Sequence, residues 1–328
     1  MKKTRNKIGI VVAMILLAGV FTGCNKEKQE ASKGKEIHLN IALQPDPGFG
    51  PGYLLRDKGW LEEELKEQNV KIKFTEFESG PPENESFAAG QQDIGVMGNV
   101  PALTGIASGQ NRSIIGISFN GEKTLATLVS ADSKITDIGG LKGKKVGLVV
   151  GSIAQNLLDE QLKHAGLSLT DVQLVNLSLG ELAVALESHQ VDAVTTWTPN
   201  ITKLTNSQNA RILADGTGIF LGERVIVANA DYVKKYPEIV DVFIEQYQRA
   251  AKEIQDHSNE FAKDYAEQFG LSSEELEQVL SNINFQITIE KKDGEDLQKT
   301  ADFLYEGGVI TKKLSVEEYI DYDIVKGE

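Results

Sequence analysis

Residues 144–200 read KKVGLVVGSIAQNLLDEQLKHAGLSLTDVQLVNLSLGELAVALESHQVDAVTTWTPN. The apolar, β-branched run from Val146 to Val150 predicts a strand that is buried on both faces. Gly151 and Ser152 end this strand, and Ser152 is a good N-cap for a helix that carries leucines on one face. A strand that enters a helix through such a turn presents backbone N–H groups at its carboxyl end, where a small anion can bind.

A similar arrangement occurs in two segments, residues 70–101 and residues 172–200. Each contains a strand, a glycine (Gly80 or Gly180), a helix, a polar turn with aspartate, a short apolar strand and a loop with proline. Two segments with the same β-α-β order predict two similar α/β lobes that face each other across a cleft.

The order of the predicted elements divides the chain between these lobes. Residues 37–125 together with residues 223–328 are expected to form the first lobe, and residues 126–222 the second. The first crossover is expected near residues 120–132. The strong strand Arg224–Ala230 then returns the chain to the first lobe, where amphipathic helices follow. The acidic C-terminal segment through Tyr319 and Tyr322 is expected to dock on the surface.

Composition limits the class of protein. The chain has 328 residues, which is enough for two domains, and its formal net charge is −14. A nucleic-acid-binding protein would usually be basic, so that class is disfavoured. The acidity favours solubility and identifies no ligand.

The N-terminal residues have the features of a secretory signal. Residues 1–24 read MKKTRNKIGIVVAMILLAGVFTGC, with a basic start, an apolar run and small residues before Cys24. The apolar run is too short to span a membrane, so a signal peptide is predicted over residues 1–23. Cys24 is the only cysteine, which excludes a disulfide framework. Residues 24–36 are predicted to be a polar tether.

The position of Cys24 after Thr22-Gly23 resembles the bacterial lipobox, in which the cysteine is acylated. We therefore expect Cys24 to anchor the chain to the membrane, since a diacylglyceryl group supplies the two acyl chains that stable anchoring needs. A plain secreted protein with a chance cysteine is the alternative.

Glycine-containing turns in the first lobe are expected at the cleft. The turns Ser79-Gly80 and Gly98-Asn99 each follow a predicted strand, so they should lie at the same edge of the sheet. The loop from Gln44 to Tyr53 carries glycines in the pattern GxGxG, which is not the spacing of a dinucleotide fingerprint. We expect this loop to close over a small ligand.

No catalytic or metal-binding pattern stands out. The histidines are far apart and lie in no HxxxH or CxxC context, so no metal site is expected. The chain has no GxSxG and no Walker A sequence, and lipidation would use its one cysteine. We expect neither enzymatic activity nor a cofactor.

Three motifs resemble the solute-binding proteins of ABC importers. They are SGPPENESFAAGQQDIGVMGNVP (79–101), DIGGLKGKKVGLVVGSIAQNLL (137–158) and ALESHQVDAVTTWTPN (185–200). The most similar branch contains the aliphatic sulfonate, taurine and nitrate binders and is related to the thiamine-precursor binders. The resemblance covers residues 37–310. It implies a type II periplasmic-binding-protein fold, with two α/β lobes, two crossovers and a ligand cleft between them. It also implies an ABC permease as partner and a monomeric chain.

The resemblance further implies which residues contact the ligand. In this family the ligand lies near the turns that match Ser79-Gly80, Gly98-Asn99 and Gly151-Ser152, and near the aromatic residue that matches Trp197. Several N–H and hydroxyl donors would hold three sulfonate oxygens without a buried Lys or Arg. The residues expected at the ligand are Gln44, Tyr53, Ser79, Gly80, Gly98, Asn99, Ser152, Asn156, Trp197 and Thr198.

These observations predict an extracytoplasmic lipoprotein that captures a small organic anion and delivers it to a permease. An aliphatic sulfonate, such as taurine or an alkanesulfonate, is the first expectation. A thiamine-type pyrimidine, nitrate or an aromatic acid would be alternative ligands. An enzyme of pyrimidine or menaquinone synthesis on the same fold is the alternative from another class, and the signal peptide and the missing catalytic groups argue against it.

We predict that Ser152→Asp abolishes binding of an anionic ligand and leaves the fold intact, because the new carboxylate lies where the anion should bind. Titration calorimetry measures the affinity of wild type and variant. An unchanged affinity would remove Ser152 from the site.

Overall fold

The structure is a computed structural model, and it describes residues 36–324. The predicted signal peptide, the predicted lipidation site Cys24 and the tether up to residue 35 lie outside the described residues. Within the described part, no helix is long and apolar enough to cross a membrane.

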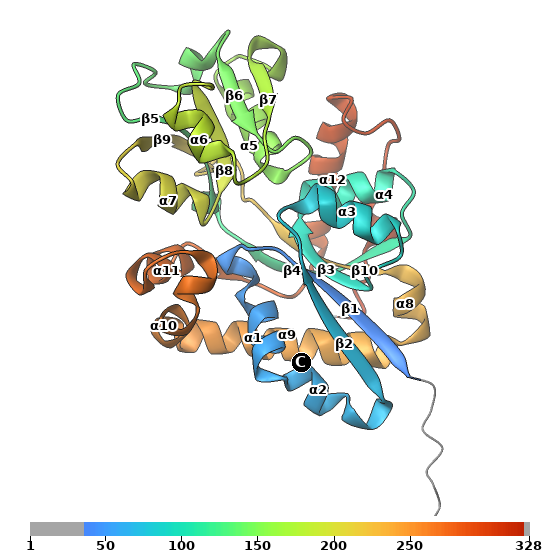
Figure 1. Cartoon of the computed structure of the whole chain (residues 1–328). Coiled ribbons are helices and arrows are strands. Elements are labelled where there is room, and N and C mark those ends of the chain that lie inside the picture. The colour runs from blue at the N-terminus through green and yellow to red at the C-terminus, as the bar shows by residue number, and fades with distance from the viewer. Residues whose placement is uncertain (1–35, 325–328) are drawn as a thin grey trace, which may run out of the picture. The chain divides into compact units, whose positions relative to one another are not determined.

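The first lobe contains a six-stranded sheet (Figure 1). Strand β1 lies between β2 and β3 and is parallel to both, whereas β10 lies between β3 and β4 and is antiparallel to both. In sheet order, the strands are β2 (Val70–Glu76), β1 (Ile37–Leu43), β3 (Ile94–Gly98), β10 (Arg224–Asn229), β4 (Arg112–Asn120) and β11 (Asn284–Phe285).

The second lobe contains a five-stranded sheet with the same plan. Strand β6 is parallel to both neighbours, and β5 is antiparallel to both of its neighbours. The prediction of two similar α/β lobes is confirmed. In sheet order, the strands are β7 (Gln173–Asn176), β6 (Lys145–Leu148), β8 (Ala193–Trp197), β5 (Leu125–Ser130) and β9 (Ala210–Asp215).

Each sheet thus takes the antiparallel strand in its interior, β10 or β5, from just beyond a crossover. Strand β5 follows the first-lobe strand β4 in the chain but pairs in the second sheet, and β10 follows the second-lobe strand β9 but pairs in the first. This reciprocal exchange joins the lobes through two segments, residues 121–124 and residues 216–223.

Helices cover both faces of each sheet (Figure 1). In the first lobe they are α1 (Gly50–Lys58), α2 (Trp60–Glu64), α3 (Gly80–Ala88), α4 (Asn99–Ala107), α8 (Ala230–Lys235), α9 (Pro237–Asp256), α10 (Ser258–Phe269), α11 (Ser273–Leu280) and α12 (Lys291–Glu306). In the second lobe they are α5 (Ile153–His164), α6 (Leu182–Glu187) and α7 (Asn200–Asn206).

Strand β10 shows why both faces of the first sheet must be covered. Its alternate residues point to opposite sides, with Ile226 in the core beneath α1, α9 and α10 and Val225 and Val227 in the core beneath α4 and α12. Residues beyond α12 pack on this second core, where Ile320 forms a bridge to Ile114 of β4. The expected surface docking of the C-terminal segment is therefore seen on the first lobe.

A buried polar network fixes α5 to the second sheet. Thr127 Oγ1 of β5 donates to Gln161 Oε1 at 2.6 Å, and Gln161 Nε2 donates to the carbonyls of Ala214 and Asp215 of β9. Gln161 is almost fully buried, so these bonds satisfy polar groups that water cannot reach. They hold the position of α5, whose first turn faces the other lobe.

The Gly- and Pro-rich segment after β1 differs from the expected loop. It forms a short 3₁₀ helix, Pro47–Phe49, that runs directly into α1. A Cβ atom on Gly48 would lie 2.3 Å from the Phe119 ring, and one on Gly52 would lie 2.4 Å from Leu43. These glycines are needed because the helix packs closely on the core, and the segment is not a loose flap over the ligand.

The two crossovers lie side by side. Gly121 N–H donates to the carbonyl of Leu221 and Gly216 N–H donates to that of Glu122, each at 2.9 Å. A Cβ atom on Gly216 would lie 2.5 Å from the Glu122 oxygen. The joint between the lobes therefore has no room for a larger residue at this point.

We predict that Gly216→Ala lowers the free energy of unfolding by about 1–3 kcal/mol, because the added methyl group overpacks the joint. Urea denaturation measures the loss. Gly180→Ala is the matched control, since nothing lies within 4 Å of a Cβ atom there. Equal urea midpoints for the two variants would contradict the prediction.

Candidate functional site

A small pocket lies between the lobes. Its volume is about 10 Å³, which is at the lower limit of a cavity that can hold one water molecule. Its walls come from the first lobe and from the first turn of α5 and the end of β8 in the second. The lining residues are Gln44, Asp46, Phe49, Gly80, Gly98, Pro101, Ser152, Ile153, Trp197 and Arg224.

Three helices begin at this pocket. Gly80 is the first residue of α3, Gly98 is the N-cap of α4, and Ser152 is the N-cap of α5. Each helix follows a parallel strand, so the strand order brings these ends to the cleft edge of the sheets. Helix N-termini carry partial positive charge, and their convergence favours an anion here.

The Gly151-Ser152 turn uses most of its own N–H groups, contrary to expectation. Gly151 N–H donates to Gln155 Oε1, Ser152 N–H to the carbonyl of Val149, and Ala154 N–H to Ser152 Oγ. The hydroxyl hydrogen of Ser152 can still be donated. Ser152 can therefore offer a ligand its side chain, while the backbone of this turn is largely occupied.

Arg224 lies at the pocket and is almost completely buried, which the sequence interpretation missed. Its Nη1 donates to Thr124 Oγ1 at 2.9 Å and to the carbonyl of Gly222 at 2.5 Å, and its Nη2 to Asp46 Oδ2 at 3.4 Å. These three bonds leave two of the five guanidinium N–H groups available to donate to a ligand. The expectation of a pocket without a buried Lys or Arg is therefore wrong. The sequence feature that could have indicated Arg224 is its position as the one charged residue of the strand RVIVANA (224–230).

Asp46 compensates the charge of Arg224. Burial raises the pKa of Asp46, while the Arg224 guanidinium and the N–H of Gly48 oppose that rise. Burial likewise lowers the pKa of Arg224, and Asp46 opposes that fall. The Thr198 hydroxyl is near enough to favour the charged form of Asp46, although its Oγ1 is not placed for a regular hydrogen bond.

Gln44 lies at the pocket in an orientation fixed by buried partners. Its Nε2 donates to Glu83 Oε2 at 2.6 Å and to the carbonyl of Val96 at 3.3 Å. Both hydrogens of the Gln44 amide nitrogen are therefore already used. Tyr53 lies in the core, outside the pocket, and its hydroxyl donates to the backbone carbonyl of Gln44.

The structure brings together half of the expected ligand residues. Gln44, Gly80, Gly98, Ser152 and Trp197 line the pocket, and Trp197 is also part of the second-lobe core. The remaining expected residues lie around it: Tyr53 in the core, Ser79 as N-cap of α3, Asn99 with its amide directed to Thr300, Asn156 at a separate larger cavity, and Thr198 beside Asp46. The residues that sequence reasoning missed are Asp46, Phe49, Pro101, Ile153 and Arg224.

Metal chemistry has no visible support in this part of the chain. Among residues 36–324, no group of three or more His, Cys, Asp or Glu side chains is arranged to hold a metal ion. The pocket offers hydrogen-bond donors, a compensated arginine and two aromatic rings, Phe49 and Trp197. This arrangement suits binding of a small anion with an organic part.

Comparisons with known proteins agree with this chemistry. The model of the NMT1/THI5-like family matches residues 46–261. A putative aliphatic sulfonates-binding protein of Bacillus subtilis is 32% identical over 97% of this chain and 95% of its own length. The alkanesulfonate-binding protein SsuA from Xanthomonas axonopodis pv. citri, solved with MOPS bound, is 26% identical, with a TM-score of 0.80 over 88% of this chain and 99% of that one.

The same fold also occurs in an enzyme. The desulfurization enzyme DSZB, solved as a mutant in complex with biphenyl-2-sulfinic acid, has a TM-score of 0.65 over 88% of this chain and 98% of that one. Its sequence identity is 17%, so the likeness is one of fold alone. The fold by itself therefore does not separate binding from catalysis.

We predict a pH-dependent stability difference for Glu83→Gln. Burial raises the pKa of Glu83 from 4.5 to about 8. Between these values the folded protein keeps a proton that the unfolded chain has lost, so the free energy of unfolding falls as pH rises, by up to about 1.4 kcal/mol per pH unit. The Glu83→Gln variant has no carboxyl group at this position, so its free energy of unfolding does not fall with pH in this way.

Urea denaturation near pH 5 and near pH 8 checks this expectation. The variant should gain stability relative to wild type as the pH rises. Glu223, whose pKa burial also raises to about 8, is present in both proteins and cancels from the difference. Parallel pH profiles would contradict the assignment.

Proposed function

From the premise that this chain belongs to the NMT1/THI5-like family, we propose that it is the solute-binding component of an ABC importer. It captures a small organic anion, an aliphatic sulfonate, between its two lobes and delivers it to the permease. Support comes from the N-termini of α3, α4 and α5, which meet the buried Arg224 at one pocket with walls from both lobes.

The pocket matches the chemistry of a sulfonate. The group spreads one negative charge over three oxygens, which suits several donors better than one strong cation. Helix N-termini contribute about 0.3–1 kcal/mol each, and hydrogen bonds to a charged group about 1.5–3 kcal/mol each. Three such bonds approach the roughly −8 kcal/mol of a micromolar site before ordering costs. Phe49 and Trp197 then cover the organic part of the ligand.

Binding is coupled to closure of the lobes. The pocket is too small in this arrangement to admit a sulfonate, so entry requires the lobes to separate. A ligand that contacts both lobes stabilises the closed form. We assign residues 37–120 and 224–324 to one moving body and residues 125–215 to the other, with the paired crossovers as the joint.

Contacts at the rim of the cleft favour the closed form. Gly180 N–H of the second lobe donates to Glu78 Oε1 of the first at 3.3 Å. Asn206 at the end of α7 likewise donates to Glu275 of α11. Opening the lobes exchanges these exposed bonds for bonds to water, at little cost. The permease would distinguish the loaded protein by the surface that these contacts bring together.

The proposed location is the extracytoplasmic face of the membrane, with Cys24 as the lipid anchor. This part of the proposal rests on the basic and apolar residues before Cys24 and on the polar tether after it. A binding role also means that the ligand is released without chemical change.

We predict that short alkanesulfonates or taurine raise the melting temperature of the purified protein selectively. Binding to the folded state at about 100 times Kd stabilises it by about 2.7 kcal/mol. A thermal-shift panel would also contain nitrate, bicarbonate, thiamine, its pyrimidine precursor and aromatic acids.

A shift only with a pyrimidine or an aromatic acid would overturn the sulfonate assignment and keep the importer role, with Phe49 and Trp197 as the main contacts. Mass analysis of the recovered ligand tests the binding role separately. A chemically altered ligand would favour an enzyme.

A further inference from the structure

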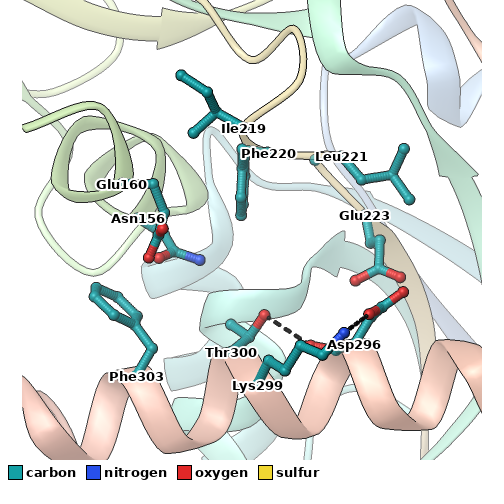
Figure 2. Close-up of a pocket in the computed structure, with 11 residues that line it drawn as sticks. Asn156, Glu160, Ile219, Phe220, Leu221, Glu223, Asp296, Lys299, Thr300 and Phe303 are labelled. Carbon is teal, nitrogen blue, oxygen red and sulfur yellow. Dashed lines mark hydrogen bonds and ion pairs between the residues drawn. The ribbon is translucent and has the colours of Figure 1, made fainter. Parts of the chain in front are cut away.

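A second, larger cavity lies beside the sulfonate pocket. Its volume is about 320 Å³, within the range of small-molecule sites. Figure 2 shows its walls, which come from α5 of the second lobe, α12 of the first lobe and the second crossover. The residues that line it are Asn156, Glu160, Ile219, Phe220, Leu221, Gly222, Glu223, Asp296, Lys299, Thr300 and Phe303.

The two spaces are neighbours that differ in chemistry. Ser152 of the pocket and Asn156 of the cavity lie one turn apart on the same face of α5, and Arg224 and Glu223 are adjacent in the chain. The pocket collects positive helix ends and a guanidinium group. The cavity instead collects carboxyl groups.

Three carboxylates line the cavity, Glu160, Glu223 and Asp296. Only one cation, Lys299, lies among the lining residues, and its Nζ is held by Asp296 at 2.6 Å. Lys163, on α5, is 3.8 Å from Glu160. Glu223 is 4% exposed and, among residues 36–324, has no cation within ion-pair distance.

The Asn156 amide forms part of the same wall of the cavity. Asn156 is only 3% exposed, and its Oδ1 has no hydrogen-bond partner within the described part of the chain. In Figure 2, Asn156 faces the cavity from α5, opposite Thr300 and Lys299 of α12.

Aromatic rings complete the lining. Phe220 projects into the cavity from the second crossover, and Phe303 closes its lower wall (Figure 2). The ammonium group of Lys163 already lies over the Phe303 ring, with Nζ 3.9 Å from the ring centroid. The Phe220 ring can offer a similar cation–π contact to a ligand, while its edge packs on the alkyl part.

We propose that this cavity binds a small organic ammonium ion. The ammonium group donates to the Glu223 carboxylate, and its alkyl part lies against Phe220. This site is separate from the sulfonate pocket and does not depend on the identity of the ligand there. The walls of the cavity come from both lobes, so a bound ammonium ion also favours the closed form. Because this coupling is reciprocal, a ligand in the pocket strengthens ammonium binding.

The ionisation of Glu223 gives the site a pH dependence. Burial raises the pKa of Glu223 to about 8, the nearby Asp296 and Asp293 add to that rise, and Asn99 and Lys299 oppose it. An ammonium ion favours the ionised form, so its affinity should increase as pH rises towards 8. From α5, the charged groups Glu160 and Lys163 also face this space.

The test is calorimetric titration of the full chain with propylammonium chloride, with 1-propanol as the neutral probe of similar shape. We expect propylammonium to bind, 1-propanol not to bind, and Glu223→Gln to weaken propylammonium by about tenfold or more, as the loss of a charge-assisted bond implies. Glu295→Gln is the matched control because it removes an exposed carboxylate of α12 outside the cavity. Its affinity should equal that of wild type.

Glu160→Gln is the second variant if Glu223→Gln does not fold, since the Glu160 side chain is 29% exposed and tolerates the change. It should also weaken propylammonium. Alkanesulfonate binding by the same variants should remain, which separates this site from the pocket. No binding of propylammonium, equal binding of 1-propanol, or an affinity unchanged in both variants would overturn the proposal.

Discussion

The guanidinium of Arg224 is the group on which the rest of the structure depends. It donates to Thr124 in the first crossover, to Gly222 in the second, and to Asp46 in the segment after β1, and it lines the interlobe pocket. Its plane also lies 4.8 Å from the centroid of the Phe119 ring. One buried cation thus joins both connections between the lobes to the interlobe pocket. A buried charge of this kind is tolerated because Asp46 and these hydrogen bonds compensate it.

In the proposed function, the neutralised arginine lets the pocket attract an anion without binding it irreversibly. Asp46 cancels the full charge, so the net attraction comes from partial charges at the ends of α3, α4 and α5 and from the remaining N–H groups. An importer needs a ligand that can leave at the permease. The residues that line the pocket supply hydrogen-bond donors and two aromatic rings for such a ligand.

The sequence allowed the strands, the two lobes and the family to be predicted, and the resemblance to sulfonate-binding solute receptors is confirmed. These features follow from local patterns, such as the alternation of apolar residues and the Gly-Ser turns. The Arg224–Asp46 pair could not be predicted, because its members are 178 residues apart. Hydrogen bonding by the Gly151-Ser152 turn was misjudged for a similar reason, since it depends on which way the Gln155 side chain turns.

The reciprocal exchange of β5 and β10 also sets an order for folding. The strands of the second sheet, β5 to β9, come from one continuous stretch of chain, so that sheet can form as soon as residue 215 is available. The first sheet cannot, because β10 lies between β3 and β4 and begins only at Arg224. Until then, β3 and β4 present unpaired edges, which are prone to pair wrongly. In the sequence, the second lobe is inserted between the two segments of the first lobe. The second lobe can therefore fold earlier, and the interlobe pocket forms last.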